Sequence, residues 1–304
     1  MAAVTAAMVK ELRESTGAGM MECKKALTET DGDMEAAVDV LRKSGAAKVE
    51  KKAGRIAAEG ITRVASEGNT AVVVEVNSET DFVAKNATFQ EFVQAVADKA
   101  LKASVDKAGD GEDVCAILDM QSELEEKTLT IGEKLSIRRF QKITGDCVAS
   151  YIHGGGRIGV LVAADGASND AIKEAMTNVA MQIAALSPKY VSTDDVSEEY
   201  KAHEKEILMA QIANDPKMAG KPEKVIEGAV VGRLNKELKE VCLLEQPYVK
   251  AEDGKQTVAQ YLAQVAKENG AKLSVKKFVR FETGEGLEKK VDDFAAEVAA
   301  QAGM

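Results

Sequence analysis

GITRVASEGNTAVVVEV, residues 60–76, carries the clearest strand pattern in this 304-residue chain. Residues 60–65 alternate between apolar and polar side chains, residues 67–69 are typical of a turn, and residues 70–76 form a strongly apolar run. Two such runs joined by a short turn predict an antiparallel β-hairpin. We therefore expect some sheet in a chain whose overall richness in Ala, Lys and Glu otherwise favours helix.

The hairpin pattern occurs twice, and each time a helix follows. Residues 87–103 place their apolar side chains on one helical face. The second hairpin has predicted strands over residues 146–153 and 157–164 with a glycine turn between them, and residues 169–186 again show helical spacing. This repetition predicts two duplicated core subdomains, each a small antiparallel sheet covered by helices, and an α+β fold class.

Helical patterns without strands flank and interrupt these two units. Residues 1–55 predict three short helices, the third of which ends near Gly45, and the basic run over residues 48–55 is interpreted as a linker or an exposed helix. Residues 113–129 predict one further polar helix. Over residues 191–244, two helical stripes with narrow apolar seams predict a protruding hairpin.

These patterns divide the chain into five parts. Beyond the hairpin we expect a helix over residues 257–267, a strand over residues 273–281 and a last amphipathic helix over residues 288–302. The proposed parts are an N-terminal three-helix domain (1–55), core subdomain N (56–145), core subdomain C (146–190 and 245–286), an inserted helical hairpin (191–244) and a C-terminal helical module (287–304).

Charge and cysteine usage exclude several classes of protein. Lys plus Arg number 40 and Asp plus Glu 50, so the net charge is −10. Proteins that neutralise phosphates are usually basic, so we expect no direct nucleic-acid binding. Four scattered cysteines and two histidines fit neither a disulfide scaffold nor a zinc centre, so we expect no metal and no cofactor. Without a signal-peptide pattern or an apolar run of roughly 18 residues, we expect a cytoplasmic protein that does not enter a membrane.

The segment GGGRIG, residues 154–159, matches the GxGxxG pattern of dinucleotide sites. Such a site needs a helix after the loop, so that the helix N-terminus faces the pyrophosphate. Here the apolar run that follows predicts a strand, so we interpret the segment as a hairpin turn. A Ser/His/acid triad would require His153 or His203, and no GxSxG motif accompanies either. The sequence therefore indicates a protein that is not an enzyme.

Residues 77–86, NSETDFVAKN, allow two interpretations. They follow an apolar strand and precede a helix, so we expect a loop at the end of the sheet. In the first interpretation Thr80 or Asp81 caps a helix and Phe82 packs into the core. In the second, Asp81 and Phe82 are presented to a partner, the ring as a wedge and the carboxylate as a competitor for a cation or its ligands.

Several stretches resemble elongation factor Ts of bacteria or organelles. They are residues 10–33, 75–86, 153–163 and 279–289 together with the closing amphipathic pattern, and they cover essentially the whole chain in order. TGAGMMECKKAL, starting at Thr16, and TDFVAKN, starting at Thr80, are the most specific. The resemblance implies a ubiquitin-associated-like N-terminal domain, a core of two subdomains, a dimerisation hairpin and a C-terminal helical module.

The resemblance also implies a function. Members of the family act as guanine-nucleotide exchange factors for elongation factor Tu, a GTPase of translation. They disturb its magnesium and phosphate site and promote GDP release, so that GTP can bind. The implied contact residues are Thr80, Asp81, Phe82 and Val83 of the TDFV motif, Met20, Met21, Cys23 and Lys24 of the second N-terminal helix, and His153 beside the glycine turn. The turn in this chain is a longer HGGG form, which leaves the reach of His153 open.

Two alternatives from other classes stay open on the sequence. One is a nucleotide-dependent enzyme that uses the glycine turn, and the other is a passive adaptor that binds the GTPase without changing the rate of GDP release. From the helical pattern we also expect at least one of Met20 and Met21 to be exposed. The narrow apolar seams over residues 191–244 favour self-association through the hairpin.

Overall fold

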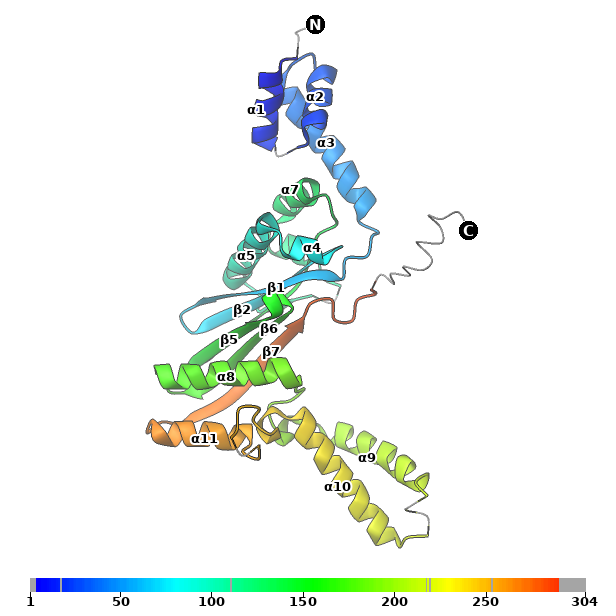
Figure 1. Cartoon of the computed structure of the whole chain (residues 1–304), viewed down its shortest axis with the longest axis vertical. Coiled ribbons are helices and arrows are strands. Elements are labelled where there is room, and N and C mark those ends of the chain that lie inside the picture. Colours follow the sequence, from blue (N-terminus) through cyan, green and yellow to red (C-terminus); the bar gives the residue numbers. More distant parts are fainter. Residues whose placement is uncertain are drawn as a thin grey trace.

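The computed structural model describes residues 4–16, 18–109, 111–216, 218, 220–252 and 254–289. Within these ranges the chain is elongated, with two antiparallel sheets between an N-terminal helical domain and a helical hairpin (Figure 1). This arrangement confirms the predicted α+β class. Among the described helices, none is long and apolar enough to cross a lipid bilayer. The N-terminal domain consists of α1 (Ala6–Thr16), α2 (Met20–Glu29) and α3 (Met34–Lys52).

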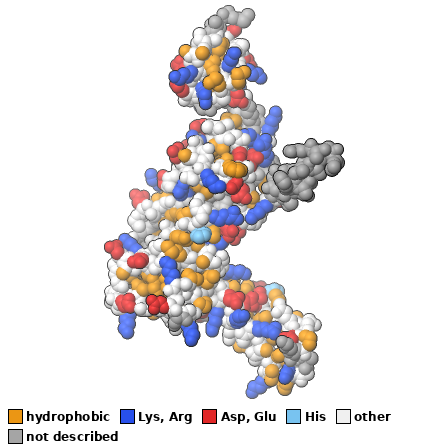
Figure 2. Space-filling view, viewed as in Figure 1, with side chains coloured by type: hydrophobic (Ala, Val, Ile, Leu, Met, Phe, Trp, Pro, Cys, Tyr) orange, Lys and Arg blue, Asp and Glu red, His pale blue; other side chains and the backbone are white. Residues whose placement is uncertain are grey.

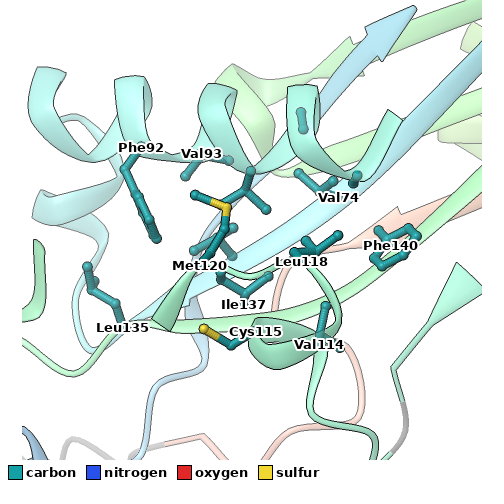
Figure 3. Packing of buried hydrophobic residues seen from close by; sticks show 14 of the residues in the cluster. Val74, Phe92, Val93, Val114, Cys115, Leu118, Met120, Leu135, Ile137 and Phe140 are labelled. Atoms are coloured by element: carbon teal, nitrogen blue, oxygen red, sulfur yellow. The ribbon is translucent and has the colours of Figure 1, made fainter. Parts of the chain in front are cut away.

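The first sheet has the strand order β1-β2-β4-β3, and its first two strands are the predicted hairpin. A long helix, α5, covers one face, and it is capped by Asn86, whose side-chain oxygen accepts a hydrogen bond from the backbone N–H of Phe89. Figure 3 shows Phe92 and Val93 of α5 pointing at the strands. The elements of this subdomain are β1 (Glu59–Glu67), β2 (Thr70–Ser78), α4 (Asp81–Ala84), α5 (Ala87–Lys102), β3 (Lys107–Ala108), α6 (Val114–Ile117), α7 (Gln121–Ile131) and β4 (Ser136–Thr144).

The second sheet has the strand order β5-β6-β7 and repeats the same plan. Its hairpin is followed by α8, which starts at Asn169 with a side-chain cap to the backbone N–H of Ile172 and packs on β5 and β6. This confirms the predicted repetition of hairpin and helix. The elements are β5 (Cys147–His153), β6 (Ile158–Gly166), α8 (Asp170–Leu186), α11 (Val258–Glu268) and β7 (Leu273–Glu282).

The two sheets pack face to face, and a separate apolar cluster fills the space between them. This cluster includes Val73 of β2 and Leu161 of β6, both fully buried. The close approach depends on Gly159, because a Cβ there would lie 2.7 Å from Thr62 Oγ1 and 2.8 Å from Val73 Cγ2. The layers are therefore α5, the first sheet, the second sheet and α8, a stack that buries both faces of both sheets.

A buried carboxylate joins the two sheets at one end. Glu75 of β2 is fully buried, and its oxygens accept from Arg138 Nη1 at 3.0 Å, Arg139 Nε at 2.6 Å and the backbone N–H of Gly284 at 2.8 Å. Consecutive strand residues normally point to opposite faces. The β-bulge opposite Glu75 and Val76 inserts Arg138 as an extra residue, so both arginines reach the same carboxylate.

The inserted segment forms the predicted hairpin of α9 (Glu198–Ala213) and α10 (Glu223–Val241). Its helices pack against each other through Leu208, Ile212 and Val230, so the apolar seam is filled within the chain. A second small cluster around Cys242 fixes the base, where the backbone of Tyr190 forms an isolated bridge with Cys242. The hairpin and the N-terminal domain lie at opposite ends of the molecule (Figure 1).

Two expectations about helix boundaries need correction. The third helix does not end near Gly45 but continues to Lys52, so most of the basic run is helical. Gly45 serves close packing instead, because a Cβ there would lie 2.7 Å from Leu129 Cδ1 of α7. The single helix predicted over residues 113–129 is two helices, α6 and α7. They are separated at Asp119, which adopts a left-handed backbone conformation with φ of 51°.

Two further differences concern the ends of the core. Strand β4 was not predicted, although it lies centrally in the first sheet between β2 and β3. The amphipathic helix expected over residues 288–302 lies almost entirely outside the described residues, which end at Lys289.

Glu75→Ala should strongly destabilise the chain. The substitution leaves the charges of Arg138 and Arg139 without their buried partner, and removing one partner of a buried ion pair costs about 3–5 kcal/mol. Chemical denaturation followed by circular dichroism measures the free energy of unfolding. The control is Glu67→Ala, an exposed carboxylate at the end of β1, which should change stability by no more than about 0.5 kcal/mol. Equal losses in both variants would contradict this account of the junction.

Candidate functional site

The TDFV segment forms a single helical turn, α4, at the end of β2. Two neighbours in this turn have opposite environments: Phe82 is 78% exposed, whereas Val83 is 7% exposed and belongs to the core beneath α5. The turn is closed by hydrogen bonds from the backbone N–H of Lys85 to Phe82 O and of Asn86 to Val83 O. The interpretation of Phe82 as a core residue is therefore wrong, and Val83 takes that place.

Thr80 precedes this turn, and its polar groups point into the protein. Its backbone N–H donates to Glu133 Oε2 at 3.0 Å and its hydroxyl donates to Glu133 Oε1 at 2.7 Å. Its carbonyl oxygen accepts from the hydroxyl of Ser78 at 3.0 Å. Thr80 occupies the N-cap position of α4 but makes no side-chain capping bond to the helix.

Asp81 and Phe82 share one cationic neighbour, Lys85. The Lys85 ammonium lies 3.4 Å from Asp81 Oδ2 and 6.0 Å from the centre of the Phe82 ring. All three side chains are exposed, so the ion pair is worth at most about 1 kcal/mol and can open at little cost. The turn thus offers a carboxylate, an aromatic ring and an ammonium group on one small surface.

Helix α2 presents a second surface. Met20 is 57% exposed and Met21 is 74% exposed, which confirms the expectation for these residues. Met21 and Lys24 line a shallow groove together with Lys25, Thr28 and Glu29. The expectation that Cys23 contacts a partner needs correction. Its side chain is fully buried in the core of the N-terminal domain, because α2 turns that position toward α1 and α3.

His153 lies at the end of β5 and is exposed. Its Nδ1 is 3.1 Å from the hydroxyl of Tyr151, and the two rings are 5.9 Å apart at their centres. The glycine turn after it folds onto the first sheet: Gly156 O accepts from the hydroxyls of Thr62 and Thr283, and a Cβ on Gly156 would lie 2.7 Å from Ile61 Cβ.

The glycine turn is not a dinucleotide site. Gly154–Gly156 forms a short 3₁₀ turn that leads directly into strand β6, as predicted. A strand rather than a helix follows the loop, so this segment lacks the helix N-terminus that binds the pyrophosphate in such sites.

Metal binding requires clustered ligands, and thiol reactivity requires an accessible thiolate. Among the described residues, no group of three or more His, Cys, Asp and Glu side chains is placed to hold a metal ion. All four cysteines are buried and unpaired. Burial, reinforced by nearby carboxylates, raises the pKa of the Cys115 thiol to about 11 and that of Cys242 to about 11. These thiols are therefore protonated and poorly nucleophilic at neutral pH.

The described surface does not gather charge of one sign on the face drawn in Figure 2. Lys and Arg side chains are interspersed with Asp and Glu along the whole length of the molecule. This distribution differs from the continuous basic stripe that is typical of proteins binding a nucleic-acid backbone.

Sequence reasoning missed the residues that surround Thr80. Glu133 and Lys134 follow α7 and are distant in the sequence, and Arg55 follows α3. Lys134 donates its backbone N–H to Glu79 Oε1 at 2.6 Å, and Arg55 Nη1 lies 3.1 Å from the same oxygen. No local pattern in residues 77–86 points to these partners.

Comparison with known proteins agrees with this architecture. A family model described as "Elongation factor TS" matches residues 79–285. The chain is also 53% identical over 313 aligned residues to "Elongation factor Ts" of Clostridioides difficile (strain 630), and the alignment covers 99% of each chain. Because the model spans more than half of the chain and the relative aligns along nearly all of it, the chain belongs to the elongation factor Ts family of translation elongation factors.

Proposed function

We propose that the chain is a guanine-nucleotide exchange factor that binds elongation factor Tu and accelerates its release of GDP. The observation that carries the proposal is the exposed ring of Phe82 beside Asp81 on an anchored turn. A large exposed apolar side chain held on a short, fixed element is suited to insertion into a partner. The membership of the elongation factor Ts family supports the role in translation.

The mechanism requires no covalent chemistry by this chain. An exchange factor binds the nucleotide-free GTPase more tightly than the nucleotide-bound form, and linkage then makes each ligand weaken the other by the same factor. Magnesium in the GTPase is a sensitive target, because it demands near-ideal octahedral geometry and bridges protein to phosphate. We infer that Phe82 acts as the wedge, while the Asp81 carboxylate competes with the ligands of that ion.

Two further surfaces extend the proposed contact. Met20 and Met21 offer flexible apolar side chains that adapt to a groove, and Lys24 beside them can pair with an acidic element of the GTPase. His153 offers an exposed imidazole at the end of β5. Cys23 is left out of this proposal because it is buried, and Val83 contributes by anchoring the turn.

A passive adaptor would bind the same GTPase and leave its nucleotide kinetics unchanged. Stopped-flow measurement of labelled GDP leaving elongation factor Tu, with and without this chain, separates the two functions. We expect faster release in its presence. An unchanged rate of GDP release at a saturating concentration of this chain would exclude exchange and leave the passive adaptor as the function.

Phe82→Ala should slow GDP release by about tenfold or more at nearly unchanged stability. The ring is exposed, so its removal creates no cavity and the free energy of unfolding should move by less than about 0.5 kcal/mol. The matched control is Phe92→Ala, in which the loss of a buried ring should lower the free energy of unfolding by about 3–5 kcal/mol. Asp81→Ala should also slow release, with the larger effect at high magnesium. A destabilised Phe82→Ala that retains normal exchange per folded molecule would exclude the wedge.

Replacing Met20 and Met21 by Ser should weaken binding to the GTPase by about tenfold, or about 1.4 kcal/mol. Both side chains are exposed, so the melting temperature should not change. The control is Met209→Ser on α9, a 48% exposed methionine at the opposite end of the molecule. Isothermal titration calorimetry measures both affinities. Equal affinities would show that α2 lies outside the interface.

We also propose that the hairpin mediates self-association. Its internal seam is filled, yet Ile207, Met209, Val225 and Val231 remain 37–48% exposed. Replacing residues 205–236 by a short Gly/Ser linker removes these side chains and keeps the buried residues Val196, Leu238 and Cys242 at the base. Sedimentation should then show a smaller oligomer, while GDP release stays within about twofold. An unchanged oligomeric state, or a collapse of exchange in a folded variant, would contradict this assignment.

A further inference from the structure

We propose that Glu133 is a positioning residue for the exchange site: its carboxylate, through Thr80, fixes the turn that carries Asp81 and Phe82. The proposal rests on the function proposed above. It also assigns Thr80 a different task from its neighbours, since Thr80 is held by the protein rather than offered to the partner.

Helix α4 is held in place by contacts outside its own residues. The turn has only four residues, far too few to be stable as an isolated helix. A threonine at the N-cap commonly bonds the helix itself, but here the hydroxyl and the backbone N–H of Thr80 both donate to the two oxygens of Glu133. The orientation of α4 is therefore set by the loop between α7 and β4 rather than by a local cap.

The contact between Thr80 and Glu133 has the geometry of strong, charge-assisted hydrogen bonds. Hydrogen bonds to an ionised carboxylate are shorter and about twice as strong as neutral ones, and the 2.7 Å distance from Thr80 Oγ1 to Glu133 Oε1 fits that class. The two bonds use both carboxylate oxygens, which fixes direction as well as distance. Both hydrogen-bond donors of Thr80, its N–H and its O–H, are therefore occupied by Glu133 and are not offered to a partner.

The same loop also holds the end of the N-terminal domain. The backbone N–H of Lys134 donates to Glu79, and Glu79 also pairs with Arg55. The ammonium group of Lys134 donates to the carbonyl oxygens of Ala53 and Arg55 at 2.7 and 2.8 Å. Lys52 at the end of α3 donates to Gly132 O at 2.5 Å. The loop over residues 132–134 therefore contacts both the base of α4 and the segment that leads from α3.

This arrangement explains how an exposed aromatic side chain can act as a wedge. Ordering a mobile segment at the moment of binding reduces affinity, and pre-organisation removes that cost. Glu133 supplies pre-organisation from outside the segment, so the exposed face of α4 stays free for the partner. Removing the carboxylate should leave Asp81 and Phe82 present but no longer held in one orientation.

The test uses the full chain with Glu133→Ala, Thr80→Val, Thr80→Ser and the double variant Thr80→Val/Glu133→Ala. Glu126→Ala is the matched control, because it removes an exposed carboxylate from α7 without touching Thr80. Two readouts are measured on each variant: release of labelled GDP from elongation factor Tu, and amide hydrogen exchange at Thr80 and through α4. Circular dichroism checks that each variant is folded.

We expect Glu133→Ala to slow GDP release and to speed hydrogen exchange at Thr80 N–H, each by about tenfold, which is the effect of about 1.4 kcal/mol. Thr80→Ser should retain both properties because it keeps both donors, whereas Thr80→Val loses the hydroxyl and should show part of the defect. Adding Thr80→Val to Glu133→Ala should cause no further loss, since both act through one contact. Glu126→Ala should match the unmodified chain.

Two results would overturn the proposal. One is unchanged hydrogen exchange and GDP release in folded Glu133→Ala. The other is a double-variant defect equal to the product of the two single defects, which would mean that Thr80 contacts the partner directly. If the unmodified chain fails to accelerate GDP release, the proposed function fails. Hydrogen exchange still decides in that case whether Glu133 holds α4, because that readout needs no GTPase.

Discussion

The buried carboxylate of Glu75 is the constraint on which the core depends. A charge removed from water must find all its partners inside the protein. Here the partners come from β4, through Arg138 and Arg139, and from the turn after β7, through the backbone N–H of Gly284. The contact therefore joins the middle of the first sheet to the end of the second. Strand β2 continues from Glu75 to Ser78, so the same junction places the start of the candidate site.

The parts of the fold that were predictable from sequence are those with regular periodicity. Both hairpins and the helices after them follow alternating or helical spacing. Strand β4 does not, because the bulge at Arg138 places Ile137 and Phe140 on the same cluster at a spacing of three. That spacing fits neither a strand nor a full helix. The continuation of α3 was missed for a related reason: Gly45 is selected by contact with Leu129, which no local rule expresses.

The candidate site was predictable as a segment but not as a geometry. NSETDFVAKN is compatible with Phe82 inside or outside, because Val83 next to it can fill the core equally well. Thr80, at the start of the turn, is bonded to Glu133, which is remote in the sequence and gives no local signal. Cys23 shows the opposite case. It lies at i−3 and i−4 from Ala26 and Leu27, both buried, so helical spacing alone predicts that it points inward.

Exposure and order are conflicting demands on a side chain that is proposed to enter a partner, and α4 meets them on adjacent residues. Successive helical positions point about 100° apart, so one turn can bury Val83 while Phe82 faces solvent. Burial of Val83 fixes the inner side of the turn, and the contact between Thr80 and Glu133 fixes its start. The charged side chains of Asp81 and Lys85 lie beside the exposed ring. The ring is thus held by its neighbours in the chain rather than by contacts of its own, which leaves its surface available for another protein.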